Sequence, residues 1–559
     1  MAAMEGTADR VGLLDKERII APPNYNRWLV PPAALAIHLC IGMAYGFSVF
    51  WLPLGRAVGV AQGLGTPIPC PGDPTTFGGK LAITAKALFA TNCDWTQFDL
   101  GWMYTLFFVL LGASAALWGG WLERVGPRRA GLVSALCWCG GLMISALGVY
   151  IHQLWLLWLG SGFIGGIGLG LGYISPVSTL IKWFPDRRGM ATGMAIMGFG
   201  GGAMIGSPLA TILMNYFRTP TSVGVWETFV SLGVIYFVFM LGGAFGYRLP
   251  PPGWKPEGWT PPTNNHAMIA TGHVHLRDAH KTVQFWLIWA VLCLNVSAGI
   301  GIIGAASPML QETFGGHLFG DPTVPFGQFS DTQKAQAALV GAAFVGLFSL
   351  FNIAGRIFWA SLSDKVGRKL TYYTFFTLGF LCYAAAPTLA TLGMLAVFAA
   401  AMCLIASMYG GGFATIPAYL ADVFGTQFVG AIHGRLLTAW STAGIVGPVI
   451  VNYMHDARVA EGVPPDQIYH PIFYVLAGLL VLGFIANLLI RPLDKKWFMS
   501  EEEVQALQAK VKVKPEAETV SAPSVAGLDV RAVLAWAAVG IPLAWGIWIT
   551  LEKALVLFG

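Results

Sequence analysis

The sequence predicts an all-α polytopic membrane protein, built from two six-helix bundles plus one additional C-terminal transmembrane helix. Of its 559 residues, 55% are hydrophobic and only 11% are charged, against about 25% charged in a typical soluble domain. Apolar runs of about 20 residues, long enough to cross a bilayer, recur along the chain. Several features also repeat at a constant offset of 364 − 123 = 241 residues, which indicates two homologous halves. The repeated pairs include Glu123 with Asp364, Pro176 with Pro417, and Gly206 with Gly447.

The first half begins after a polar, basic segment at 1–28, which we interpret as a cytoplasmic N-terminal tail. The N-terminal six-helix bundle then occupies 29–247. Its loop 55–96 is rich in proline and unusually long for a compact bundle, so we expect it to form an ordered external cap. The predicted spans of this half are 29–54, 97–121, 130–151, 154–183, 189–216 and 226–247.

A polar, proline-rich segment at 248–283 forms a cytoplasmic linker to the C-terminal six-helix bundle at 284–492. A second cytoplasmic tail at 493–530 leads to the extra transmembrane helix, predicted at 531–557. The predicted spans of the second half are 284–309, 336–362, 371–391, 395–421, 430–453 and 471–491.

Charge predicts the orientation of these spans. Most Lys and Arg residues lie in the N-terminal tail, the linker and the turns that follow even-numbered spans. Cytoplasmic loops carry the excess of Lys and Arg in membrane proteins. We therefore expect a multi-pass protein of the plasma (inner) membrane with a cytoplasmic N-terminus and an external C-terminus.

The eight cysteines fall into two groups. Six lie in apolar runs, where cysteine behaves as a small buried hydrophobe. Cys70 and Cys93 lie together in the polar loop 55–96. If that loop is external they could form a disulfide, since such bonds persist in oxidising compartments.

Arg356 is the most informative single residue, because it interrupts an apolar run that starts near Ala337. It lies 364 − 356 = 8 residues before the charged turn at Asp364, or about 12 Å along a helix. An arginine at such a depth costs about 2.5–3.5 kcal/mol and usually faces the bundle interior or a wet cavity. Its fork of donors suits a carboxylate. The alternative is a structural role in hydrogen bonding to helix ends.

Other polar side chains within predicted spans are weaker candidates. Tyr45, Tyr173 and Tyr409 could each donate a hydrogen bond to a substrate, or could pack in the core. His38 is the one histidine well inside a span, so it is either a proton site or a satisfied core histidine. No Asp or Glu lies deep in any predicted span. That absence favours anion exchange over proton coupling.

The turn after the second span resembles the loop motif of the major facilitator superfamily. A second, less complete copy follows the eighth span, with Ala360 in place of the first glycine. The resemblance implies a major facilitator fold in which these charges form a breakable conformational latch near a helix end. Alternatively, the charges only orient the helices. The motif residues are Gly119, Glu123, Arg124, Gly126 and Arg128, then Asp364, Lys365, Gly367 and Arg368.

Three further stretches, 168–176, 305–309 and 410–425, resemble the oxalate:formate antiporter family. The resemblance implies that Arg356 contacts a substrate carboxylate. It also implies a second cation in the eleventh span, within a Thr-Ala-Lys-Gly-like stretch. Here that stretch reads Thr-Ala-Trp-Ser, so Trp440 stands where the lysine is expected and a dianion loses one charge partner. Trp440 either lines the cavity or contacts lipid or core.

Together these features predict a secondary active transporter of small carboxylate anions that works by alternating access, with oxalate:formate-type exchange. The alternative is a proton-coupled symporter of a monocarboxylate such as pyruvate, lactate, formate or glycolate. A transporter-like sensor is a remote alternative, since no substantial soluble output domain is present. We expect no enzymatic activity, cofactor, metal or nucleic-acid partner. The expected partners are small carboxylates and the lipid bilayer, and the expected state is a monomer.

Overall fold

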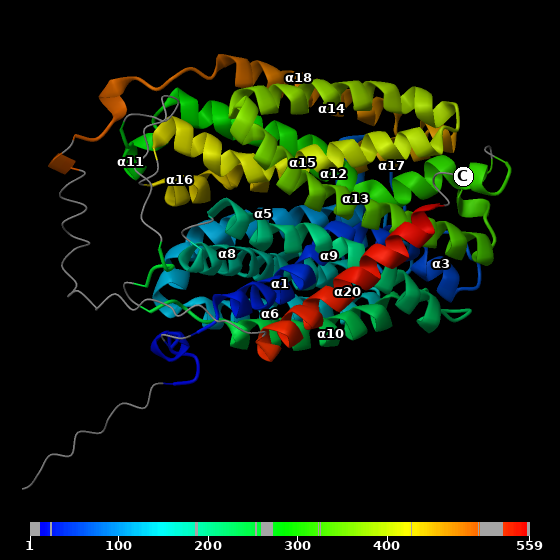
Figure 1. The fold of residues 1–559 in the computed structure, drawn as a ribbon. Helices are drawn as coiled ribbons and strands as arrows, with labels where there is room; N and C mark the ends of the chain where they lie inside the picture. The colour runs from blue at the N-terminus through cyan, green and yellow to red at the C-terminus, as the bar shows by residue number, and fades with distance from the viewer. Residues whose placement is uncertain are drawn as a thin grey trace, which may run out of the picture.

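The computed structural model is all-helical apart from isolated bridges. It describes residues 12–22, 25–184, 188–251, 254–258, 272–321, 324, 326–425, 428–500, 502–503 and 529–555. Within these residues, 13 helical segments are long and apolar enough to cross a membrane. Figure 1 shows them as two groups of roughly parallel helices lying side by side, with α20 (Val530–Ala554) crossing both.

The N-terminal group contains six spans. The first is composite, running through α1 (Val30–Ile41), the 3-10 helix η3 (Gly42–Phe50) and α2 (Trp51–Leu54). The fourth contains a π-helical stretch (Trp158–Gly165) ahead of α8. Such departures from α-helix often mark functional positions. The remaining elements are α5 (Gln97–Val125), α6 (Pro127–Tyr150), α7 (Leu154–Leu157), α8 (Gly166–Trp183), α9 (Arg188–Phe217) and α10 (Val225–Gly246).

The C-terminal group repeats this arrangement after the short α11 (Leu276–Ala279). Gly126 and Gly367, 241 residues apart, end equivalent helices with φ of 84° and 91°, a backbone region that favours glycine. The elements are α12 (Val283–Leu318), α13 (Asp331–Val366), α14 (Arg368–Thr391), α15 (Leu395–Phe424), α16 (Val429–Leu436), α17 (Thr438–Ala460) and α18 (His470–Leu489).

Several helices extend beyond the apolar runs that predicted them, and two of them matter for the site. α12 continues to Leu318 rather than 309, and α17 continues to Ala460 rather than 453. Glu312 and Asp456 therefore lie inside helices, a few residues beyond the predicted bounds of their spans. Hydropathy falls at these residues, but the helical hydrogen bonds continue because the polar side chains find partners on neighbouring helices.

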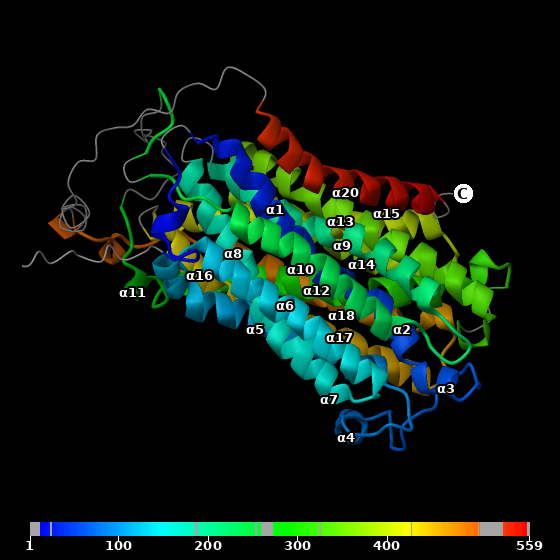
Figure 2. The ribbon, with the colours of Figure 1, turned by 90° about the horizontal axis from the view of Figure 1, so that it is seen from below.

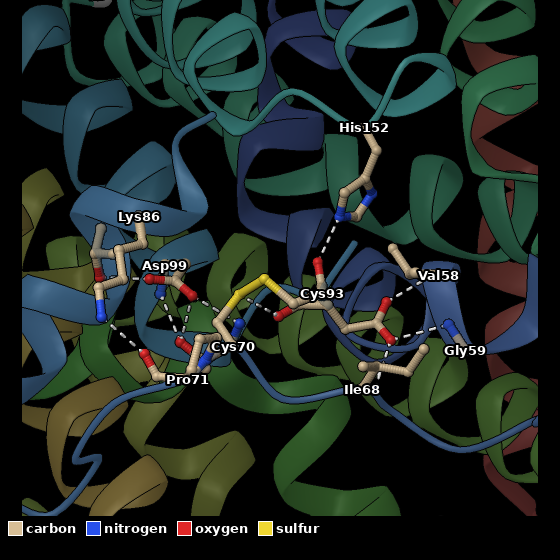
Figure 3. The surroundings of a disulfide bond; sticks show 12 residues. Val58, Gly59, Ile68, Cys70, Pro71, Lys86, Cys93, Asp99 and His152 are labelled. Carbon is tan, nitrogen blue, oxygen red and sulfur yellow. Dashed lines mark hydrogen bonds between the residues drawn. A yellow bond between two sulfur atoms is a disulfide. The ribbon is translucent and has the colours of Figure 1, made fainter. Parts of the chain in front are cut away.

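The loop 55–96 is an ordered cap, as its length predicted. It contains α3 (Ala57–Ala61) and α4 (Phe77–Ala87), which Figure 2 shows together at one end of the bundle. We name this end the cap face, and the opposite end, which carries the linker 248–283, the linker face. Cys70 and Cys93 are joined by a disulfide. Figure 3 shows His152 beside it, with the Cys93 carbonyl oxygen 2.8 Å from the imidazole Nε2.

The two halves meet along two helix pairs, α5 with α17 and α9 with α13. Small residues permit the close approach. A side chain at Gly112 would collide with Ser441, and one at Gly200 would collide with Asn352. Small residues have the same role at many membrane helix interfaces. The contact between the halves thus brings α13, which carries Arg356, against the N-terminal bundle.

Candidate functional site

Arg356 lies on α13 in the centre of the contact between the halves, with 2% of its surface exposed. Its Nε donates to Asn352 Oδ1 at 3.0 Å, one helical turn earlier. The position of α13 is set by close packing on α15. A side chain at Gly355 would collide with the Ser407 carbonyl oxygen, and one at Gly410 with the Asn352 carbonyl oxygen. The guanidinium is therefore held by backbone packing as well as by its own hydrogen bond.

The three candidate tyrosines are all buried and converge on Arg356. Tyr45, on the 3-10 stretch of the first span, shares a 2.9 Å hydrogen bond between its hydroxyl oxygen and that of Tyr409 on α15. Both phenols interact electrostatically with Arg356, and so does the phenol of Tyr173 on α8. Since Tyr45 and Tyr173 come from the N-terminal half, the group links both halves of the molecule.

Trp440 also belongs to this site, on α17 near its linker-face end. Its ring lies in a shell of four aromatic side chains, three from the N-terminal half and one from the C-terminal half. The ring centroids lie at 4.5 Å for Phe413, 5.3 Å for Tyr173, 5.8 Å for Phe199 and 5.8 Å for Phe108. The Arg356 guanidinium lies 5.9 Å from the centroid of Phe413. A cation–π contact of this kind retains the charge without neutralising it.

Three nitrogen donors in this buried site have no acceptor in the structure: Arg356 Nη1, Asn352 Nδ2 and Trp440 Nε1. Buried polar groups are normally hydrogen-bonded, because an unpaired donor costs about 1–3 kcal/mol. A cavity of about 10 Å³ lies beside Tyr45 and Asn352, which is room for about one water molecule. The site is therefore rich in donors and nearly closed in this conformation.

Closure on the cap side comes from contacts between the first span and α12. Trp51 Nε1 donates to the Gly304 carbonyl oxygen at 2.7 Å. The backbone N–H of Ser307 donates to Ser48 Oγ at 3.3 Å. Together with the aromatic shell around Trp440 on the other side, these contacts enclose Arg356 from both faces.

His38 is placed in the core of the N-terminal half. Its Nε2 lies 3.1 Å from the Tyr173 carbonyl oxygen, and its ring is 5.6 Å from the ring of Tyr173. It therefore lies behind Tyr173, with that ring adjacent to the Arg356 site. The structure thus brings His38 near the site, packed against Tyr173.

The loop-motif residues gather at the linker face, and each described contact stays within one half. Arg128 donates to the carbonyl oxygens of Leu13 at 2.9 Å and Phe245 at 3.2 Å. Arg368 Nε lies 3.6 Å from Asp422 Oδ2, which joins the start of α14 to the end of α15. Gly119, Arg124 and Lys365 lie in the helices before the turns. The side chains of Glu123 and Asp364 lie outside the described part of the structure.

A buried acid–histidine cluster near the cap face escaped prediction. His455 Nε2 lies 2.9 Å from Glu312 Oε2, and its Nδ1 lies 2.8 Å from Asp456 Oδ1. Asp456 Oδ2 also accepts the backbone N–H of Phe98 from the other half, at 2.7 Å. These residues fall just beyond the apolar runs. A prediction that placed the helix ends by capping residues, rather than by hydropathy, would have included them within the helices.

Asn352 and Phe413 were also missed. Asn352 precedes Arg356 by four residues, the spacing that places two side chains on one helix face, so the sequence did contain a signal for it. Phe413 precedes Pro417 on α15 and carries no signal beyond its aromatic character. Its role depends on which helix packs opposite Arg356.

Two six-helix halves enclosing a buried cation define a multi-pass membrane protein of the secondary-transporter type. The chain matches the Major Facilitator Superfamily model over residues 74–448 and 297–557, and it belongs to this superfamily of transporters.

Its relatives include carboxylate transporters. The oxalate:formate antiporter of Oxalobacter formigenes is 27% identical over 62% of this chain and 73% of its own length. Apicoplast pyruvate carrier 1 of Toxoplasma gondii is 28% identical over 71% of this chain and 78% of its own length. Monocarboxylate transporter 12 of Mus musculus is 23% identical over 57% of this chain and 65% of its own length.

Proposed function

We propose that this protein is a secondary active carrier of small carboxylate anions, working by alternating access with oxalate:formate-type exchange. The observation that carries the proposal is the buried Arg356, whose Nη1 has no acceptor and whose neighbours Asn352 and Trp440 offer further unpaired donors. A carboxylate accepts hydrogen bonds from such donors and neutralises the charge.

Exchange follows from the cost of moving an uncompensated charge. An empty carrier would have to reorient with a buried, unpaired guanidinium, which is expensive in a low-dielectric interior. A bound anion removes that cost, so reorientation is easiest when one carboxylate has replaced another. The disulfide supports placing the cap face outside the cell, since disulfides form in oxidising compartments. The N-terminus would then be cytoplasmic.

A second candidate is proton-coupled symport of a monocarboxylate. Trp440 in place of the expected lysine leaves Arg356 as the one cation among the described site residues, which matches a single carboxylate. Glu312 and Asp456, whose side chains are 12% and 11% exposed just beyond the predicted spans, also weaken the argument for exchange from a lack of buried acids. In this case His38, which packs behind Tyr173, is the candidate proton site nearest the arginine.

The test is uptake of labelled oxalate, formate and pyruvate into proteoliposomes, with and without preloaded anion. We expect uptake to require an internal anion and to fall at least a hundredfold in Arg356→Ala. Arg356→Lys should retain part of the activity, because it keeps the charge but not the fork of donors. Arg491→Ala, an exposed arginine at the linker face, is the matched control.

Uptake driven by a pH gradient, with nothing preloaded, would favour symport over exchange. Failure of all three anions to move in any condition would contradict the carrier proposal and favour the sensor alternative. Full activity of Arg356→Ala would show that the arginine is structural.

A further inference from the structure

A cavity of about 360 Å³ lies under the cap, separate from the enclosed Arg356 site. Its wall includes the cap residues Pro67 to Pro69, the disulfide neighbour Asp94, and residues of the C-terminal half. Three cations line it, and all are more than nine-tenths buried. They are Arg56 (7% exposed), Lys80 (3%) and Lys334 (6%).

The lysines are unusual because lysine is almost never buried without a partner. Among the described residues, neither the Lys80 nor the Lys334 ammonium makes a hydrogen bond or an ion pair. The ammonium of Lys80 lies 5.7 Å from the centroid of Tyr453. That contact stabilises a cation only weakly.

Carboxylates on the same wall do not neutralise these cations by contact. The carboxylate of Asp94 accepts hydrogen bonds from the backbone N–H groups of Val58 at 2.6 Å and Gly59 at 3.0 Å. Glu312 and Asp456 are bound to His455 at 2.9 and 2.8 Å. The wall therefore presents acids that already have hydrogen-bond partners, and two lysine ammonium groups that, among the described residues, contact no acid directly.

Positive charge accumulates further at one side of the cavity. Arg56, Lys334 and Arg218 are close enough to repel one another electrostatically. Their shared counter-ion is Asp331, which contacts Arg218 at 2.7 Å and Arg56 at 3.4 Å. Asp331 is 72% exposed, so solvent weakens its effect. Three cations facing one exposed carboxylate leave an excess of positive charge.

From these observations we infer a second anion-binding site under the cap, formed by Arg56 and Lys334, with Lys80 lining the same cavity. The inference rests on the proposed function in its choice of ligand, a small carboxylate. The site would collect the anion at the cap face before the first span and α12 separate to admit it to Arg356. Arg56 and Lys334 come from different halves, so a bound anion would also bridge the halves.

The test is the stoichiometry of labelled oxalate bound at equilibrium to the purified full-length protein. We expect two oxalates per chain in the wild type, and one in Arg356→Ala, in which the outer site is intact. One oxalate should also remain in the Arg56→Gln/Lys334→Gln variant. Lys86→Gln is the matched control, since Lys86 lies on the cap but outside the cavity.

One oxalate in the wild type, unchanged in Arg56→Gln/Lys334→Gln and lost in Arg356→Ala, would overturn the outer site while leaving the proposed function intact. Retention of both oxalates in Arg356→Ala would instead contradict the proposed function. Displacement of the outer oxalate by equimolar inorganic phosphate would overturn the assignment to carboxylates.

Transport provides a second readout in case the double variant is unstable. The single variant Lys334→Gln should raise the apparent KM for uptake from the cap face about tenfold, with the maximal rate unchanged. Arg356 is intact in this variant, so its central site still functions. An unchanged KM in Lys334→Gln would overturn the outer site.

Discussion

At the scale of residues, the site is a single arginine surrounded by aromatic rings and amide donors. The presence of Trp440 rather than a lysine determines the net charge of the site. Where the resemblance to the oxalate:formate antiporter family implies a lysine, this chain has an indole within 4.5 Å of Phe413, measured between ring centroids. Under the proposed function an anion would be held by one positive charge and by neutral donors, an arrangement that favours a monoanion over a dianion.

Restoring the cation should therefore change the preference between anions. We predict that Trp440→Lys raises the ratio of oxalate to formate uptake about tenfold, equivalent to roughly 1.4 kcal/mol. Trp440→Phe keeps the aromatic shell and should leave the ratio near that of the wild type. The measurement is competitive uptake of the two labelled anions. An unchanged ratio in an active Trp440→Lys carrier would place Trp440 outside the substrate contacts.

His152 offers a prediction about pH. Its ring is stacked on Trp95 at 4.2 Å between centroids. Burial lowers the pKa of His152 from its usual 6.5, although the hydrogen bond to the Cys93 carbonyl opposes the shift. The folded cap thus binds fewer protons than the unfolded cap. Neutral His152 therefore contributes to the stability of the folded cap. This contribution is fully present above pH 6.5 and is lost as the pH falls towards the pKa of His152 in the folded state.

We therefore expect the Cys70–Cys93 disulfide to be reduced faster by a phosphine at pH 5 than at pH 7.5, because the cap opens more often. In His152→Gln most of this pH dependence should disappear, since the titrating group is removed. The rate of thiol appearance measures the effect. Equal pH dependence in the two proteins would show that another group controls opening of the cap.

At the scale of elements, α20 is the part without a counterpart in the repeated halves. It contacts α1 and α9 of the N-terminal half and α13 of the C-terminal half. Trp536 Nε1 donates to the Trp28 carbonyl oxygen at 3.1 Å, and Thr550 packs on Gly346. Because α9 and α13 form one of the contacts between the halves, α20 lies across an interface that the proposed alternating access would rearrange.

Removal of α20 should make that rearrangement easier. We predict that truncation after residue 528 leaves an active carrier with at least a twofold higher turnover, measured as counterflow in proteoliposomes. The melting temperature in detergent should fall, by about 2–4 °C for each kcal/mol of packing lost. Truncation after residue 555 removes only the last four residues and is the control. Slower turnover of the 528 truncation would indicate that α20 assists transport.

At the scale of the whole molecule, the structure is closed at the cap face by contacts that cross between halves. His455 stands between Glu312 and Asp456, and Asp456 in turn accepts the N–H of Phe98 at the start of α5. A neutral imidazole carries one N–H, whereas both ring nitrogens here face carboxylate oxygens. The closed arrangement of His455, Glu312 and Asp456 therefore contains one more proton than a neutral imidazole beside two ionised carboxylates would.

Loss of this histidine should open the cap face. In His455→Gln the two buried carboxylates lose their shared partner, and an uncompensated buried charge costs about 3–5 kcal/mol. We predict at least tenfold faster labelling of Ser48→Cys by an impermeant thiol reagent, because Ser48 is buried in the closed contact. Labelling of the parent protein gives the background, and His470→Gln is the matched control. Unchanged labelling would mean that Trp51 and Ser307 suffice for closure.

Sequence patterns alone predicted the transmembrane architecture and the repeat, and they singled out Arg356 as a candidate site residue. These follow from local properties, since the hydropathy of a segment and the cost of burying a charge in it depend on the residues of that segment alone. The tertiary structure alone decided which residues meet. Phe413 meets Arg356 only because α15 packs on α13, and Trp440 joins the site only because α17 brings its ring against Phe413.

Helix ends show the same division. Glu312 and Asp456 lie in helices that extend past their apolar runs, because partners from other helices satisfy them there. In the sequence, Lys80 and Lys334 look like ordinary polar residues near loops. In the folded protein both are buried and line one cavity. Burial depends on neighbours distant in sequence, and no local pattern contains that information.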